Sequence, residues 1–237
     1  MCGRYAASAT ATELVETFRV DETTEEGVAA CQPRFNIAPT DPVPAIVERS
    51  GEAEPVRKLV ELAWGLVPSW SKDARGAARL INARSETVAT KPSFRKAFAA
   101  RRCLLPAIGY YEWRGETDAS GKPIKQPWFL RPADGGLMVM AGIYEFWKSP
   151  AREWLATCSI ITTQAADGIG WVHDRMPMQV AAGDWDAWLS PEVSDPREAQ
   201  SLLLTPVADS LQVYPVSREV NRNTTDGPHL IEPVSTA

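Results

Sequence analysis

The second residue of the chain is a cysteine that would combine two nucleophiles once the initiator methionine is removed. Cys2 lies between Met1 and Gly3, and methionine before a small residue is commonly cleaved off. The new terminus would carry an α-amine with a reference pKa of about 7.7–8.0 beside a thiol of about 8.5. Such a 1,2-aminothiol condenses with an aldehyde to a Schiff base, which the thiol then closes to a thiazolidine ring.

Two other interpretations of Cys2 start from the same tripeptide. Free cysteines are commonly buried and behave as small hydrophobic residues. N-terminal-nucleophile hydrolases, among them the glutamine amidotransferases, also open with Met-Cys-Gly and use the cysteine to attack an amide. The opening residues do not separate these three alternatives.

A carboxyl group and an imidazole are candidates for proton transfer. Glu112 lies in a strongly apolar run, where alternation places it on the same side as Tyr110, and burial among aromatic rings would raise its pKa. His173, next to Asp174 and Arg175, could act as a general acid or base near neutral pH. The structural alternatives are an edge-strand carboxylate paired with a cation and a hydrogen-bonded structural histidine.

Charge is distributed unevenly along a chain whose formal net charge is −5. Residues 72–102 carry a balance of +7, whereas residues 13–26 carry −5. This asymmetry favours a basic face for a polyanion, although solvated helix surfaces would produce the same pattern. Aromatic and apolar residues lie beside the basic residues, namely Trp64, Pro68, Trp70 and Phe94. Proteins that bind single strands combine basic residues with stacking groups in the same way.

Composition is that of an ordinary globular protein, with 44% hydrophobic and 23% charged residues among 237. No apolar run reaches the roughly 18 residues of a membrane helix, and the N-terminus lacks the apolar region of a secretory signal. The four cysteines, none of them at CxxC spacing, predict free thiols in a reducing cytosol and neither a zinc site nor a disulfide framework. We expect no metal and no cofactor.

The pattern of apolar residues and turn signals predicts a single α+β domain over residues 1–220, followed by a weakly ordered C-terminal tail over 221–237. We expect a mainly antiparallel, barrel-like β core with flanking helices. Predicted strands cover 43–49, 56–64, 103–114, 127–131, 137–147, 154–163, 176–180 and 211–216, the four central ones as a meander. Predicted helices cover 12–18, 82–90, 93–101, 184–189 and 196–204, while 20–42 is expected to be irregular and Asn82 to cap its helix.

Six sequence blocks in order, from residue 1 to about residue 217, resemble the SOS response-associated peptidase (SRAP) family. They are Met-Cys-Gly-Arg-Tyr at the start, Arg34-Phe-Asn-Ile-Ala-Pro39, Trp64-Gly-Leu-Val-Pro68, Ile81-Asn-Ala-Arg-Ser-Glu-Thr87, Gly109-Tyr-Tyr-Glu-Trp113 and His173-Asp-Arg-Met-Pro177. Any one block is a weak signal, but six in order are highly specific. The resemblance implies the SRAP fold.

The resemblance also implies a function, namely the recognition and shielding of abasic sites in single-stranded DNA. By motif, Cys2 forms the covalent DNA–protein crosslink, and Asn82, Glu112 and His173 complete the active site. Arg4, Arg84 and Arg175 match positions expected to hold phosphates, whereas Pro39 and Trp70 match apolar groups that pack against the strand. We therefore expect a monomer that does not bind a membrane. It would lie in the cytoplasm, and on the nucleoid when it is bound to DNA.

Side activities and alternatives accompany this interpretation. A Schiff base that fails to close could eliminate the 3′ phosphate, which is lyase activity, and the family name suggests that the protein releases its own Met1. An amidotransferase-type hydrolase would instead release ammonia from glutamine without binding DNA. A third alternative, a non-catalytic single-strand binder, would bind reversibly and survive Cys2→Ala.

Overall fold

A computed structural model of the chain describes residues 3–50, 54–117 and 120–235. Its smaller sheet has five strands in the order β15-β9-β8-β1-β3, and all its pairings are antiparallel. The strands are β1 (Arg4–Ala7), β3 (Arg34–Ile37), β8 (Gly109–Thr117), β9 (Pro123–Pro132) and β15 (Leu211–Pro215).

The larger sheet is mainly antiparallel, with a core order of β12-β11-β5-β4-β7-β10-β13-β14. Within the described residues, parallel pairs join β11 to β5, β11 to β6, and β2 to β5. The strands are β2 (Glu22–Thr23), β4 (Pro42–Arg49), β5 (Val56–Trp64), β6 (Asn82–Arg84), β7 (Arg102–Ala107), β10 (Met138–Lys148), β11 (Trp154–Gln164), β12 (Arg175–Pro177), β13 (Gln179–Val180) and β14 (Leu203–Leu204).

The main apolar core lies between the two sheets. Tyr5 and Leu130 of the smaller sheet pack in one buried cluster with Leu105 and Met140 of the larger one. Tyr5 also meets Trp64 edge to face, with ring centroids 5.1 Å apart. Because both sheets turn an apolar face toward this common interior, the predicted α+β fold with a mainly antiparallel, barrel-like core is confirmed.

The predicted meander is wrong in one respect, because the chain changes sheets as it proceeds. The expected strand 103–114 is broken at Ile108 into β7 of the larger sheet and β8 of the smaller one. Gly109 permits the crossing, since a Cβ there would lie 2.5 Å from the Leu130 carbonyl oxygen. Between β9 and β10 the chain crosses back to the larger sheet.

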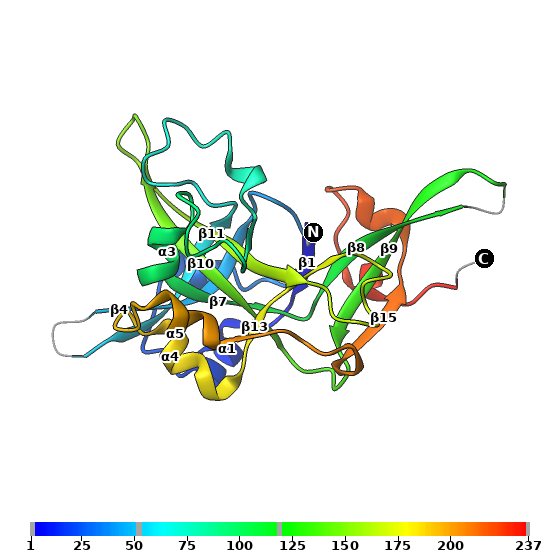
Figure 1. Cartoon of the computed structure of the whole chain (residues 1–237). Helices are drawn as coiled ribbons and strands as arrows, with labels where there is room; N and C mark the ends of the chain where they lie inside the picture. Colours follow the sequence, from blue (N-terminus) through cyan, green and yellow to red (C-terminus); the bar gives the residue numbers. More distant parts are fainter. Residues whose placement is uncertain (1–2, 51–53, 118–119, 236–237) are drawn as a thin grey trace.

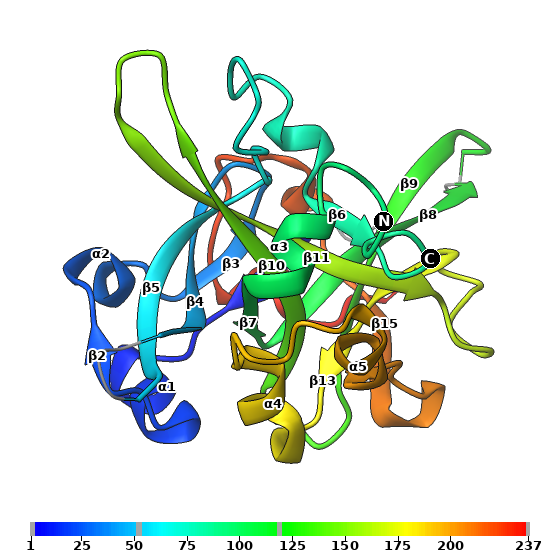
Figure 2. The same ribbon diagram turned by 60° about the vertical axis from the view of Figure 1, so that its left-hand side comes forward.

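Helices cover the outer face of the larger sheet (Figure 2). Leu14, Phe98 and Trp188 come from three of them and pack in one cluster with strand residues such as Leu104. Among the described helices none is long and apolar enough to cross a membrane. The α-helices are α1 (Ala11–Phe18), α2 (Glu25–Ala29), α3 (Arg95–Ala100), α4 (Trp185–Leu189) and α5 (Pro196–Ser201).

Two local predictions are wrong. The segment predicted as a helix over 82–90 begins with β6, in which Asn82 pairs with Ile160 of β11, so Asn82 is no helix cap. Turns follow, and the next helix starts only at Arg95. Pairing with β11 supplies the backbone of 82–84 with partners that local helix propensity could not outweigh. The segment 20–42, expected to be irregular, contains β2, α2 and β3.

The C-terminal segment is packed rather than weakly ordered as expected. It contains two 3-10 turns, Arg218–Asn221 and Pro228–Ile231, and Leu230 is 0% exposed in a cluster with Tyr111 and Phe129. Val234 N–H donates to the Pro215 carbonyl (2.9 Å). The outer face of the smaller sheet is apolar and needs a cover, which this segment provides, as its red ribbon shows in Figure 1. A domain boundary at residue 220 stays a prediction.

Leu230→Ala should lower the free energy of unfolding by about 2–5 kcal/mol, because truncation of this fully buried side chain leaves a cavity in its place. Urea denaturation followed by tryptophan fluorescence measures it. Val234→Ala, at a position 38% exposed, is the control and should cost far less. Equal stability of Leu230→Ala and the wild type would show that the segment does not support the fold.

Candidate active site

A pocket of about 510 Å³ brings together three of the residues singled out from the sequence, Arg4, Glu112 and His173. Glu112 comes from β8 of the smaller sheet, and His173 from the segment just before β12 of the larger sheet. The pocket therefore lies at the rim between the sheets. Among the described residues, Trp113, Lys125 and Asn221 also line it.

Pairing of β1 with β8 places Arg4 beside the residues of this pocket. Arg4 lies opposite Tyr111, and Tyr5 opposite Tyr110. In this antiparallel register Gly3, the described residue before Arg4, lies toward Glu112. Cys2, the predicted nucleophile, lies outside the described residues.

Glu112 is a carboxyl group held in an apolar setting. It is 3% exposed, lies directly opposite Trp128 of β9, and shares its face of β8 with the core residue Tyr110. Burial raises its pKa to about 7, and the negative charge of Asp174 acts in the same direction. Near neutral pH the group is therefore divided between its two protonation states and suits proton transfer.

His173 is held in one tautomer by the backbone that follows it. The Arg175 N–H donates to Nδ1 (3.0 Å), so a neutral ring carries its proton on Nε2. Burial lowers the pKa of His173, although Asp174, whose Oδ1 lies 2.9 Å from Nδ1, raises it. A carboxylate and an unprotonated nitrogen are both hydrogen-bond acceptors. The contact between Asp174 and His173 is therefore attractive only when the imidazole is charged. At neutral pH the imidazole is mainly uncharged.

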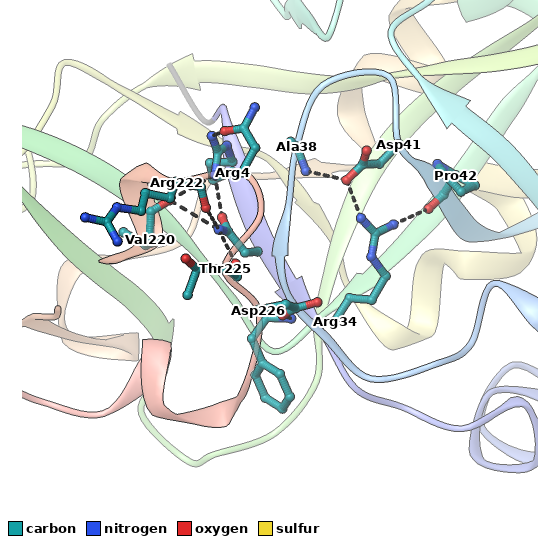
Figure 3. A network of polar contacts seen from close by, with 12 residues as sticks. Arg4, Arg34, Ala38, Asp41, Pro42, Val220, Arg222, Thr225 and Asp226 are labelled. Carbon is teal, nitrogen blue, oxygen red and sulfur yellow. Dashed lines mark hydrogen bonds and ion pairs between the residues drawn. The ribbon is translucent and has the colours of Figure 1, made fainter. Parts of the chain in front are cut away.

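Arg4 reaches the pocket from β1 and is held by two other parts of the chain. Its Nη1 donates to Asn36 Oδ1 (2.5 Å) and to the Val220 carbonyl (3.0 Å), and its Nη2 donates to Asn223 Oδ1. Figure 3 shows this network, in which β1, β3 and the C-terminal segment meet. Burial lowers the pKa of Arg4, but from a value so high that the charge is kept.

Asn82, Arg84 and Arg175 gather instead around the end of β11. Asn82 and Arg84 lie on β6, where Arg84 is opposite Thr162, and Arg175 pairs with Gln164 from β12. Arg84 is exposed. The Arg175 side chain, by contrast, is only 11% exposed, and its guanidinium forms a bidentate pair with Glu86 (2.6 and 3.0 Å). None of the three lines the pocket.

Pro39 and Trp70 lie on two loops outside the pocket lining. Pro39 is half-buried in the turn after β3, and Thr40 N–H ties that turn to the Trp64 carbonyl (2.7 Å). Trp70 is 64% exposed, although its neighbour Ser71 accepts a hydrogen bond from the indole of Trp147 (2.8 Å). An exposed ring on an anchored loop can stack on a base.

The basic segment 72–102 is largely a surface feature, and Figure 1 shows its cyan-to-green loops on one side of the molecule. Two of its residues belong to the fold instead. Arg102 is 2% exposed and donates to backbone carbonyls that include those of Trp188 and Phe98, while Arg101 pairs with Glu145. The exposed members are Lys72, Arg75, Arg79, Arg84, Lys91, Arg95 and Lys96.

Three pocket residues were missed from the sequence. Trp113 stands in the same block as Glu112, so its place was the easiest to foresee. Lys125 reaches the pocket because it pairs with Gly115 across the β8–β9 hairpin. Asn221 accepts a hydrogen bond from the Trp113 indole (2.7 Å), but no local signal marks a residue whose position depends on the folding back of the C-terminal segment.

The cysteines among the described residues are poorly suited to act as nucleophiles. Cys31, Cys103 and Cys158 are free and buried, and burial raises the pKa of each, that of Cys31 to about 11. A raised pKa suppresses the reactive thiolate. Within the described ranges no group of three or more His, Cys, Asp or Glu could hold a metal ion.

Comparison with known proteins covers nearly the whole chain. The abasic site processing protein YoqW of Bacillus subtilis is 35% identical over 232 residues, which cover 98% of this chain and 99% of that protein. The abasic site processing protein HMCES of Gallus gallus is 29% identical, over 99% of this chain and 78% of its own length.

A crystal structure of a protein from Bacteroides thetaiotaomicron shares the fold, with a TM-score of 0.83 at 24% identity over 99% of this chain and all of the other. The family described as SOS response associated peptidase (SRAP) matches residues 1–223, which include every described residue of the pocket. The chain belongs to the SRAP family.

Proposed function

We propose that this protein recognises abasic sites in single-stranded DNA and bonds to them covalently through Cys2 after Met1 is removed. The observation that carries the proposal is Glu112, a buried carboxyl with a pKa of about 7 in a pocket that is also lined by Arg4, the first residue of β1. The names of YoqW and HMCES, both abasic site processing proteins, support it.

The chemistry starts from a sugar that is mostly a closed hemiacetal. Ring opening moves the hydroxyl proton at C1′ to the ring oxygen, a transfer for which Glu112 and His173 supply an acid and a base. The Cys2 amine adds to the aldehyde, and protonated Glu112 helps the resulting carbinolamine lose water to form the imine. The thiol sulfur then adds to the imine carbon and its proton ends on nitrogen, which closes the thiazolidine. One water molecule is released in total.

The DNA backbone would lie across the pocket, held by phosphate contacts. Arg4 at the pocket and the exposed Arg84 on β6 present guanidinium groups suited to phosphates. Arg175 would have to share its guanidinium between a phosphate and Glu86. Pro39 and the exposed Trp70 would pack against bases, and Asn82 would hydrogen-bond the terminal amine or a sugar oxygen. The exposed part of the basic segment would attract the strand.

Two minor activities accompany the crosslink in this proposal. An imine that does not close can lose the 3′ phosphate by β-elimination, which cuts the strand. Hydrolysis of the Met1–Cys2 peptide bond by the same acid and base would be the peptidase activity of the family name. The protein would act as a monomer in the cytoplasm, on the nucleoid when bound, and would serve the response to DNA damage.

The proposal predicts a crosslink on a single-stranded oligonucleotide that carries one abasic site. Protein whose N-terminus is verified as cysteine should give a band that migrates slowly in a denaturing gel, and Cys2→Ala should give none. Absence of the band with the verified protein would overturn the covalent mechanism, and ammonia release from glutamine would then test the amidotransferase alternative.

Crosslinking should depend on pH with a maximum between about pH 7 and 8, because the amine must be neutral and Glu112 protonated. The rate rises as the amine loses its proton and falls as Glu112 loses its own. Glu112→Gln should be slower and should lack the fall at high pH. Single-turnover rates from pH 5.5 to 9 test this, and a variant with an unchanged profile would remove Glu112 from the chemistry.

Burial of Glu112 should also affect how the free energy of unfolding of the DNA-free protein depends on pH. Between about pH 4.5 and 7 the folded protein binds a proton at Glu112 that the unfolded chain has lost, so stability falls as pH rises through this range. Glu112→Gln removes that penalty and should be more stable than the wild type by up to about 3 kcal/mol at pH 8, but not at pH 4.5. Urea unfolding at both pH values measures the difference, and an equal difference at both would contradict the raised pKa.

A further inference from the structure

Asn36 is a buried amide beside Arg4. It lies on β3, the strand beside β1, and is 4% exposed. Its Oδ1 accepts a hydrogen bond from Arg4 Nη1 (2.5 Å). Its Nδ2 lies 3.2, 3.0 and 2.8 Å from the carbonyl oxygens of Val220, Arg222 and Thr225. One side chain therefore joins a pocket arginine to three carbonyls of the C-terminal segment. Figure 3 labels these partners, Arg4, Val220, Arg222 and Thr225.

The loop that contains these carbonyls, residues 220–225, is itself part of the pocket. Asn221 lines the pocket and accepts from the Trp113 indole (2.7 Å). The Val220 carbonyl and the Asn223 side chain accept from Arg4. Arg4 and this loop thus hold each other, and Asn36 holds both from the buried side.

We propose that Asn36 is a positioning residue that fixes Arg4 and the 220–225 loop in the geometry that receives a DNA phosphate. The inference rests on the proposed function, in which Arg4 contacts the DNA backbone. The acceptors from Asn36, Val220 and Asn223 are neutral oxygens, so they orient the guanidinium without neutralising it. A long side chain ordered before binding loses less entropy when the phosphate arrives.

An amide is suited to this position because it both accepts and donates. Aspartate would keep an acceptor for Arg4 but would turn a second oxygen toward three carbonyl oxygens. An apolar residue would remove the hydrogen bonds to all four partners. The rest of the segment has anchors of its own. Asp226 Oδ1 accepts from Phe35 N–H (2.7 Å), and Leu230 is fully buried. The loss of Asn36 should therefore loosen the loop without releasing the segment.

The test compares wild type, Asn36→Ala, Arg4→Ala and the double variant in the full chain. Fluorescence anisotropy with a single-stranded oligonucleotide that carries tetrahydrofuran, an abasic analogue without an aldehyde, measures reversible binding. Asn36→Ala should raise the dissociation constant about 3- to 10-fold, and the double variant should bind no more weakly than Arg4→Ala.

The control is Asp226→Ala, which removes another anchor of the segment but no contact of Arg4. Its dissociation constant should stay within about twofold of the wild type. An equal weakening by Asp226→Ala, additive effects of Asn36→Ala and Arg4→Ala, or wild-type binding by either single variant would overturn the inference. Should Asn36→Ala not fold, Asn223→Ala provides the test, because Asn223 is exposed. This variant should raise the dissociation constant by a smaller factor, and it should have no effect when Arg4 is already alanine. Loss of crosslinking by the wild type itself would overturn the proposed function instead.

Discussion

The antiparallel pairing of β1 with β8 is the constraint on which the rest of the site depends. It sets Arg4 opposite Tyr111, the neighbour of Glu112 on β8. Backbone hydrogen bonds on a buried strand fix this register, because a slip by one residue would exchange Tyr5 of the core with Arg4 of the pocket. The reactivity proposed for Cys2 thus depends on a strand that begins two residues later.

The same pairing places Glu112 at the rim of the barrel, where burial shifts its pKa. The interior between the sheets is apolar, and Glu112 stands where that interior ends, so its carboxyl is desolvated yet lines an open pocket. His173 arrives from the other sheet with a lowered pKa. Two groups whose environments shift their pKa values in opposite directions, one upward and one downward, can exchange protons near neutral pH.

The C-terminal segment connects stability with the site. Its apolar side chains cover the outer face of the smaller sheet, while its polar backbone meets Arg4 and Asn36 at the edge of that sheet. A sheet with both faces covered is held more rigidly than one exposed to water, which favours a fixed position for the pocket residues. The segment predicted as a weakly ordered tail is therefore part of the structure that surrounds the pocket.

The sequence alone determined the family and which kinds of side chain the site would contain. Six blocks in order and an acid within an aromatic strand are local features. The sequence also predicted a helix over 12–18, which lies within α1, and most of the long strands. Only the tertiary structure decided that 82–84 is a strand, that Arg175 pairs with Glu86, and that Asn36 and Asn221 reach the site. Each of these depends on partners far away in sequence, and a local pattern carries no information about which distant backbone will supply its hydrogen bonds.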